Sequence, residues 1–339
     1  MASRAMRPED WVRVRPEGLY VEPGNFFVDP GRVVETAIIT HGHSDHARAG
    51  NGRVAATQAT LDIMTQRMNR RPWRECQALA YGERLQVGDV TVWLAPAGHV
   101  LGSAQVVLEY AGQRVVISGD YKRQSDPTCA AFELVPCDVF VTEATFGLPV
   151  FQHPDPGYEV TRLLHSREIY PNRPVVVHAY SLGKAQRMLA LLRAADYQRP
   201  IYVAPIILGV CEIYRKHGID LGDLRALDQL KNNPGSEIIL APPSKPGEGI
   251  VGKLRDPLIV MASGWMTVRK HARGRGAELP LVISDHADWN ELVSTIQDLA
   301  PEEVWVTHGR EDALILQTQR LGIKARALSA IGNGAGAEQ

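Results

Sequence analysis

Hydrophobic and polar residues alternate over short stretches in the first half of the chain, a pattern that predicts β-strands joined by tight turns. Three hairpins are expected, with turns at Pro23-Gly24, Gly88-Asp89 and Ala111-Gly112. One helix is expected between them, over residues 59–68. Strands grouped in this way, with few helices, favour stacked sheets of antiparallel or mixed type.

The pattern changes after about Thr145, where apolar runs alternate with segments of helical period. Residues 173–195 and 199–218 each read as a buried strand, a turn and a helix, and residues 256–266 as a further strand. Alternation of this kind is typical of a parallel sheet. Residues 279–310 then read as strand, helix and strand, which we interpret as a return to the first domain.

We therefore predict a domain inserted within another domain. The outer domain would comprise residues 1–150 and 280–330, and the inserted domain residues 151–279. Residues 331–339, rich in glycine and alanine, are expected to form a disordered tail.

Composition limits the classes of protein that this chain can be. Its 339 residues are 45% hydrophobic and 22% charged, with a formal net charge of −1, so a sizeable core is expected. This charge argues against binding nucleic acid by bulk charge alone, although a local basic cleft stays compatible with it. The four cysteines show no C-x-x-C spacing and read as reduced thiols: Cys76, Cys129, Cys137 and Cys211.

The N-terminal sequence has no apolar core of a signal peptide, and no run of 18 apolar residues occurs along the chain. We therefore expect no membrane partner and a cytoplasmic location.

Three histidines and an aspartate crowd the stretch "HGHSDH": His41, His43, Asp45 and His46. If the preceding strand continues, the first two histidines point the same way, and the last two residues lie on the turn beyond it. Imidazole nitrogen and carboxylate oxygen are ligands that zinc accepts. One segment can thus serve two adjacent metals, but each site needs further ligands from elsewhere.

Suitable partners follow three other apolar strands, each beside a glycine. They are His99 in "AGHV", Asp120 in "SGDY" and His308 in "THGR". Any one of them alone could be a buried or turn residue with a structural role. The full set, in this order, points to ligands placed on a rigid scaffold.

The order H-x-H-x-D-H, then His99, then Asp120, resembles the metallo-β-lactamase fold, an αββα sandwich, and Asp29 stands where that fold keeps an early structural aspartate. The long interval between Asp120 and His286 resembles the β-CASP nucleases, which carry an inserted domain. Further motifs of that group match "VTEATFG" with Glu143, "ISDHADWNEL" with His286, and "VTHGR" with His308. The resemblance spans nearly the whole chain.

The resemblance implies a nuclease with two divalent metal ions, zinc or alternatively manganese. One ion would be held by His41, His43 and His99, and the other by Asp45, His46 and His308, with Asp120 between them. His286, oriented by Glu143, would protonate the leaving oxygen. The catalytic set is thus Asp45, Asp120, Glu143 and His286.

Three stretches of the inserted domain suggest contacts with substrate. "AYSLGKAQR", with Ser181 and Lys184, is similar to a stretch of the DNA-repair members that holds a terminal 5′-phosphate. "MASGWM", with Trp265, is similar to a Thr-Gly-Trp stretch of the same members. The run "RKHARGR" supplies Arg269, Lys270, Arg273 and Arg275 for phosphate contacts, or else is a solvated loop.

These features resemble most closely the bacterial exonucleases associated with DNA ligases. The resemblance implies hydrolysis of single-stranded DNA from a 5′-phosphorylated end in DNA repair, with a DNA ligase or a helicase as partner. Retention of His308 is typical of the RNA-cutting members instead, so an RNA-processing nuclease, like those of mRNA 3′-end processing or ribonuclease J, is the alternative. A small-molecule hydrolase of the same fold leaves Glu143, His286 and the inserted domain unexplained. An inactive scaffold of this group would lack metal ligands, and all of them are present here.

Overall fold

The computed structural model describes residues 6–232, 234–244, 248–274 and 276–331. These residues form two compact units. The first comprises the described residues up to Ser125, Cys129–Pro149, and those from His286 onward. The second comprises Asp126–Thr128 and Val150–Asp285.

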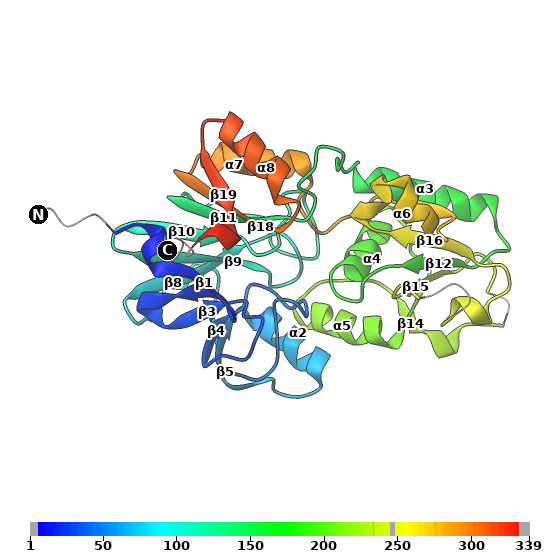
Figure 1. The fold of residues 1–339 in the computed structure, drawn as a ribbon. Helices are drawn as coiled ribbons and strands as arrows, with labels where there is room; N and C mark the ends of the chain where they lie inside the picture. Colours follow the sequence, from blue (N-terminus) through cyan, green and yellow to red (C-terminus); the bar gives the residue numbers. More distant parts are fainter. Residues whose placement is uncertain (1–5, 233, 245–247, 275, 332–339) are drawn as a thin grey trace, which may run out of the picture. The chain divides into compact units, whose positions relative to one another are not determined.

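Two sheets form the centre of the first unit (Figure 1). In the described part of the chain, the first sheet has six strands in the order β1-β2-β3-β4-β5-β6, and the second has seven in the order β19-β18-β11-β10-β9-β8-β7. The first sheet consists of β1 (Val12–Arg15), β2 (Gly18–Val21), β3 (Phe26–Val28), β4 (Thr36–Ile38), β5 (Asn51–Ala56) and β6 (Trp73–Ala78). The second consists of β7 (Leu85–Val87), β8 (Val90–Pro96), β9 (Ala104–Tyr110), β10 (Gln113–Ile117), β11 (Val139–Ala144), β18 (Glu303–Gly309) and β19 (Lys324–Ala327).

The two sheets are mixed, and the three predicted hairpins are present as the antiparallel pairs β2–β3, β7–β8 and β9–β10. The predicted helix at residues 59–68 is α2 (Gln58–Met68), capped by the hydroxyl of Thr57. Parallel pairing joins β10 to β11, β11 to β18 and β18 to β19.

The layers of the first unit follow from its apolar clusters. Residues of both sheets, among them Phe26, Val106 and Trp305, pack between the sheets. On the outer face of the first sheet, Leu61 and Met64 of α2 pack against β5. On the outer face of the second sheet lie α7 (Trp289–Leu299) and α8 (Glu311–Arg320). The order helix, sheet, sheet, helix confirms the predicted αββα sandwich; α1 (Pro8–Trp11) adds one short turn.

The second unit contains one sheet whose strand pairs are all parallel, as its alternating pattern predicts. Within the described residues its order is β14-β13-β15-β12-β16-β17. The strands are β12 (Val175–His178), β13 (Ile201–Val203), β14 (Leu224–Ala226), β15 (Ile238–Ala241), β16 (Leu258–Ala262) and β17 (Leu279–Leu281). The helices are α3 (Pro156–Ile169), α4 (Lys184–Ala194), α5 (Pro205–Lys216) and α6 (Arg269–Gly274).

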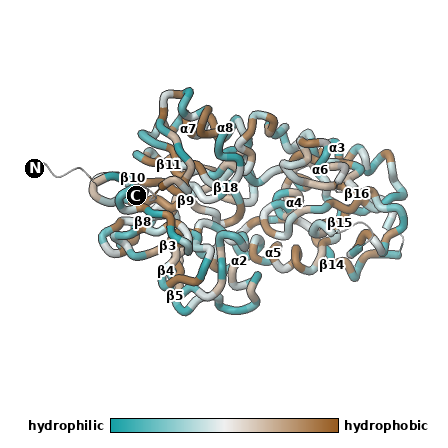
Figure 2. Tube along the Cα trace, in the orientation of Figure 1, coloured by the Kyte–Doolittle hydropathy of each residue, from teal (hydrophilic) through white to brown (hydrophobic). Residues whose placement is uncertain are grey.

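Figure 2 shows hydrophobic stretches along strands of both units, whereas many peripheral turns are hydrophilic. Among the described helices, none combines the length and the apolar character needed to cross a membrane.

Two expectations from the sequence need correction. The strand at residues 279–281 does not return to the first domain, because β17 pairs with β16 of the second unit, and the change of unit falls between Asp285 and His286. Ile331, placed in the expected tail, is buried in the core between the sheets of the first unit. The rest of that tail, residues 332–339, lies outside the described residues.

Candidate metal centre

The segment with three histidines leaves the sheet directly after β4, so the chain is a loop from Ile39 onward rather than a continued strand. Asp29 fixes the start of this loop, because its carboxylate accepts hydrogen bonds from the Thr40 N–H (2.8 Å) and from the Thr40 hydroxyl (2.5 Å). A hydrogen bond from the Ala47 N–H to the His43 carbonyl (2.8 Å) closes the turn. The loop is thereby held by internal polar contacts, as a rigid ligand-bearing segment requires.

His99 follows β8 and Asp120 follows β10, two strands that both pair with β9. The Ser103 hydroxyl accepts hydrogen bonds from the N–H groups of His99 (3.1 Å) and Val100 (3.2 Å), which fixes the turn around His99. Gly119, just before Asp120, has φ +56°, and a Cβ there would lie 2.8 Å from the Cβ of Thr40. Glycine is therefore required for the close approach of the two ligand-bearing loops.

His308 stands in an irregularity near the end of β18. The register pairs Glu143 with Thr307 and Ala144 with Gly309, so His308 is skipped and bulges from the ladder. Its φ is +51°, and Gly309 has φ +128°. This bulge turns the His308 side chain toward Asp120, with its Nδ1 3.9 Å from Asp120 Oδ1.

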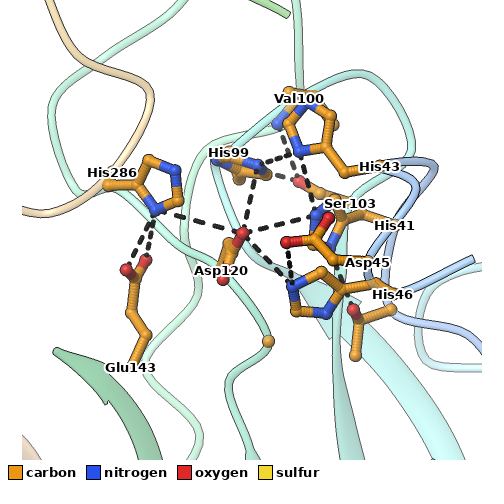
Figure 3. Close-up of polar contacts among 12 residues, drawn as sticks. His41, His43, Asp45, His46, His99, Val100, Ser103, Asp120, Glu143 and His286 are labelled. Carbon is orange, nitrogen blue, oxygen red and sulfur yellow. Dashed lines mark hydrogen bonds and ion pairs between the residues drawn. The ribbon is translucent and has the colours of Figure 1, made fainter. Parts of the chain in front are cut away.

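Asp120 lies at the centre of the histidines (Figure 3). Its Oδ2 is 3.4 Å from Nε2 of His41, 3.4 Å from Nε2 of His46 and 3.7 Å from Nε2 of His99. His41, His46, His99 and Asp120 are all buried, so these four side chains meet away from bulk water.

Three imidazole nitrogens face one another beside this carboxylate. Nδ1 of His43 lies 3.1 Å from Nε2 of His41 and 3.0 Å from Nε2 of His99. A single proton can bridge only one of these pairs, whereas a divalent ion binds the lone pairs of all three. The donor set of His41, His43, His99 and Asp120 therefore fits a metal ion.

A second set of possible ligands, His46, Asp120 and His308, shares Asp120 with the first. The Nδ1 of His46 lies 2.7 Å from Asp29 Oδ2, an arrangement that orients Nε2 toward Asp120. In the described part of the chain Asp45 belongs to none of the ligand clusters; its exposed carboxylate lies 3.9 Å from His46 Nε2. Its role as a ligand stays a prediction.

His41 and Asp120 are in the charge states that metal binding requires, whereas His46 has to lose a proton when it binds a metal ion. Burial and the nearby His46 lower the pKa of His41 well below its usual value, so His41 is a neutral ligand. Burial also opposes protonation of His46, but Asp120 and Asp29 outweigh it and raise the pKa of His46. Despite burial, His46 and His286 hold the pKa of Asp120 well below its usual value, so Asp120 is a carboxylate.

His286 and Glu143 form a pair beside these ligands. His286 Nδ1 lies 2.9 Å from Oε2 and 3.1 Å from Oε1 of the buried Glu143, and 4.0 Å from Asp120 Oδ2. The Tyr121 N–H donates to Glu143 Oε1 (2.8 Å), and the Tyr121 carbonyl accepts from the Ala287 N–H (2.6 Å). Both members of the pair are thus fixed by the backbone of one residue.

The predicted substrate contacts lie in the second unit. Lys184, expected to contact phosphate, is buried, and its Nζ lies 3.1 Å from Asp285 Oδ2. Its role as a phosphate contact stays a prediction. Ser181 is half-buried in the turn between β12 and α4. The sequence-predicted basic run forms α6, on which Lys270 is exposed. Arg269 and Arg273 occupy backbone positions of that helix, and Arg275 lies outside the described residues.

Some residues of the site were missed from the sequence. Thr40 links Asp29 to His41, its hydroxyl lying 3.0 Å from His41 Nδ1, and Tyr121 acts through its backbone. Adjacency to a ligand is the signal that could have marked Thr40 and Tyr121. Asp29, expected in a structural role, is also close enough to His41 and His46 to form a possible ligand cluster with them.

A fold of this type with this donor set is suited to metal-dependent hydrolysis. Residues 28–162 match the metallo-beta-lactamase superfamily, so the chain carries a metallo-β-lactamase domain, as predicted. The crystal structure of a protein of unknown function from Enterococcus faecalis V583 matches with a TM-score of 0.55 and 13% identity, over 81% of this chain and 75% of that one, which supports the fold alone.

Three curated relatives extend the comparison. A protein named "Probable DNA ligase" from Opitutus terrae is 25% identical over 92% of this chain and 30% of its own length. The cleavage and polyadenylation specificity factor subunit 3-I of Arabidopsis thaliana is 23% identical over 87% of this chain and 54% of its own length. An endoribonuclease of Gibberella zeae is 29% identical over 49% of this chain and 21% of its own length. The chain thus spans about half or less of each relative, and these matches are consistent with the β-CASP nuclease family.

Proposed function

We propose that the chain is a metal-dependent nuclease that removes nucleotides from single-stranded DNA, starting at a 5′-phosphorylated end. The single observation that carries the nuclease assignment is the His286–Glu143 pair beside the shared Asp120. Metal ligands alone would serve many hydrolytic reactions, whereas a separate oriented imidazole suits the expulsion of a poor leaving group such as a sugar oxygen.

When bound at this centre, two divalent ions would polarise a phosphoryl oxygen and supply a water that deprotonates near neutral pH. His41, His43, His99 and Asp120 would hold one ion, and His46, Asp120 and His308 the other, with Asp45 as a further proposed ligand. Zinc suits these nitrogen and oxygen donors, and manganese is a second candidate.

The residues around the centre orient and move protons. Glu143 accepts a hydrogen bond from His286 Nδ1 and so orients the ring; in the imidazolium form of His286, Nε2–H is then the group that delivers a proton to the leaving oxygen and leaves a neutral imidazole. Asp29 likewise orients the ring of His46, whose Nδ1 it engages. In the second unit, Ser181 and the N-terminal amides of α4 are the proposed contacts of the terminal phosphate. Further proposed contacts of the DNA strand are Trp265, Arg269, Lys270 and Arg273.

An RNA nuclease is the second candidate. The observation that favours it is His308, which lies 3.9 Å from Asp120, because the second ligand cluster depends on it and RNA-cutting β-CASP members keep this histidine. The names of two relatives, a cleavage and polyadenylation factor subunit and an endoribonuclease, support it as well. The match to a protein named "Probable DNA ligase" supports DNA as the substrate. It also supports a ligase of the same repair pathway as a partner, and a helicase is the other candidate partner.

Purified protein incubated with 3′-labelled single-stranded DNA or RNA of one sequence, each with and without a 5′-phosphate, tests the proposal. We expect 5′-phosphorylated DNA to be consumed fastest, with mononucleotides released from its 5′ end. Internal cleavage of RNA with the DNA left intact would establish the second candidate instead. Hydrolysis of neither polymer, by metal-loaded protein, would reject both.

A further inference from the structure

The parallel sheet of the second unit has a switch point between two neighbouring strands. After β12 the chain passes through α4 to β13, on one side of β12, whereas after β16 it continues to β17, on the opposite side. Where connections from adjacent parallel strands diverge, a crevice opens at the carboxyl ends of the strands, and ligands commonly bind there.

A cavity of about 190 Å³ lies at this point, lined by Tyr180, Met261, Trp265, Met266 and His271 among others. Tyr180 follows β12, and Trp265 follows β16. The volume is below the roughly 300–1,000 Å³ of pockets that enclose whole small molecules, so it suits one planar group of a larger ligand.

Aromatic rings in this cavity are unusually accessible. Tyr180 is 54% exposed and Trp265 37% exposed. The Trp265 ring is held edge-on by Phe151, with ring centroids 5.2 Å apart, and His271 lies 5.5 Å from it. A large aromatic surface left in water but fixed in orientation is typical of a binding site, because little entropy is lost when a second ring stacks on it.

The charges nearby select the ligand. Among the described residues that line the cavity none is acidic, which argues against a cationic ligand. The helix α6 begins four residues after Trp265 and carries Arg269, Lys270 and Arg273, of which Lys270 is exposed. Basic residues beside accessible rings match the chemistry of a base joined to phosphates.

We propose that this cavity binds one unpaired nucleobase of the substrate strand, stacked against Trp265 and Tyr180. The base must be unpaired and unstacked, because the faces of a base in a duplex are already covered by its neighbours. This inference rests on the proposed function and adds to it a base-binding subsite that depends on ring stacking rather than on phosphate contacts.

The experiment compares two 3′-labelled single strands of equal length and charge, oligothymidylate and a strand in which tetrahydrofuran abasic residues replace the nucleosides. Binding is measured by fluorescence anisotropy on the full chain, with His286→Ala in every protein to slow cleavage. We expect the parent to bind the strand with bases roughly 5- to 100-fold more tightly. Trp265→Ala should remove most of that difference without weakening the abasic strand, and Trp265→Phe should keep part of it.

Two further variants make the outcome decisive. Tyr158→Ala removes another exposed aromatic ring, on α3, and should leave both affinities unchanged. Tyr180→Ala should lower the preference for bases even if Trp265→Ala fails to fold. Equal binding of the two strands by the parent, or equal losses on both strands in the variants, would overturn the subsite while leaving the nuclease proposal intact. If the protein with His286 intact cleaves neither DNA nor RNA and its His286→Ala form binds neither strand, both proposals are overturned.

Discussion

At the scale of single residues, the metal centre depends on side chains that belong to neither of the two proposed ligand sets. Asp29 is the clearest case, because one carboxylate fixes the Thr40 backbone and also engages His46 Nδ1. Its own φ of +45° is strained for most residues, but aspartate and asparagine tolerate it. An asparagine should therefore preserve the fold of the loop while changing its chemistry.

We predict that Asp29→Asn lowers metal affinity by about 10- to 100-fold. The amide would donate to His46 Nδ1, so the ring would carry its proton on Nε2, the nitrogen that faces Asp120. Competition with a chromophoric chelator measures the affinity, and thermal unfolding of the metal-free protein checks the fold. Asp196→Asn is the matched control, because Asp196 also has a positive φ, +61°, but lies in the second unit. An unchanged affinity in Asp29→Asn would show that this contact does not tune His46.

His286 gives the second prediction at this scale. His286→Ala should keep its bound metal but lose about 10²- to 10⁴-fold in kcat on an ordinary phosphodiester, because the leaving oxygen then lacks its proton donor. A substrate with a nitrophenolate leaving group needs no proton and should be hydrolysed at nearly the parent rate. The control His165→Ala removes an exposed imidazole of α3 and should change neither rate. A variant that is equally slow on both substrates would place the role of His286 elsewhere than in proton donation.

At the scale of elements, ligand placement depends on where strands end and how they bulge. His308 reaches Asp120 because β18 skips one residue against β11 and because Gly309 then rejoins the ladder with φ +128°. A Cβ on Gly309 would lie 2.0 Å from the Ala144 carbonyl oxygen, which the fold cannot accommodate without moving one of the two strands. The bulge and the second ligand cluster are therefore linked.

We predict that Gly309→Ala reduces the metal content of the purified protein from two ions to about one and lowers activity at least tenfold. It should also destabilise the protein by about 1–3 kcal/mol, the usual cost of backbone strain. Elemental analysis and denaturant unfolding measure the two effects. Gly322→Ala has the same kind of positive φ, +81°, but no atom within 4 Å of the added Cβ, so it should lose some stability and keep both metals. Equal metal content in the two variants would contradict the link.

Many of the strands and hairpins could be predicted from the sequence, because the signals that specify them are local. Period-two alternation with a turn dipeptide is a local signal, and the hairpins at Gly88-Asp89 and Ala111-Gly112 form as predicted. The strand at residues 279–281 has a local signal too, but which sheet it joins depends on its parallel pairing with β16. Pairing of that kind is not encoded in the strand itself, so the domain to which it belongs was misassigned.

Contacts between residues distant in sequence also limited the prediction of individual site residues. The histidines and Asp120 could be recognised because ligand types recur beside glycines at strand ends, and the structure brings them together. The burial of Lys184 could not be recognised, because its partner, Asp285, is distant in sequence and meets it only in the folded second unit. A lysine after a glycine at a helix start has the same appearance in sequence whether it binds phosphate or a carboxylate.

At the scale of the whole molecule, the chain passes between the units next to a cluster of buried charges. Asp126 and Asp285 each stand beside a change of unit, after Ser125 and before His286. Within the second unit Asp285 is 3.1 Å from Lys184 and 3.9 Å from Arg187, and Asp126 is 3.4 Å from Arg187. Arg187 also donates to the Ser284 carbonyl. These ion pairs hold the second unit where the chain first enters it and where it last leaves it.

This arrangement yields a prediction for Lys184→Ala. Removing one member of a buried ion pair leaves the other charge poorly compensated, which costs about 3–5 kcal/mol in general; Arg187 still faces Asp285, so the lower end is expected. The variant should unfold at a lower temperature, and its rates on 5′-phosphorylated and 5′-hydroxyl DNA should fall by the same factor. Lys184→Met combined with Asp285→Asn removes both charges and should recover part of the lost stability. If Lys184→Ala instead keeps its melting temperature and slows only the phosphorylated strand, then Lys184 reaches the terminal phosphate during turnover, and the ion pair with Asp285 is its resting contact.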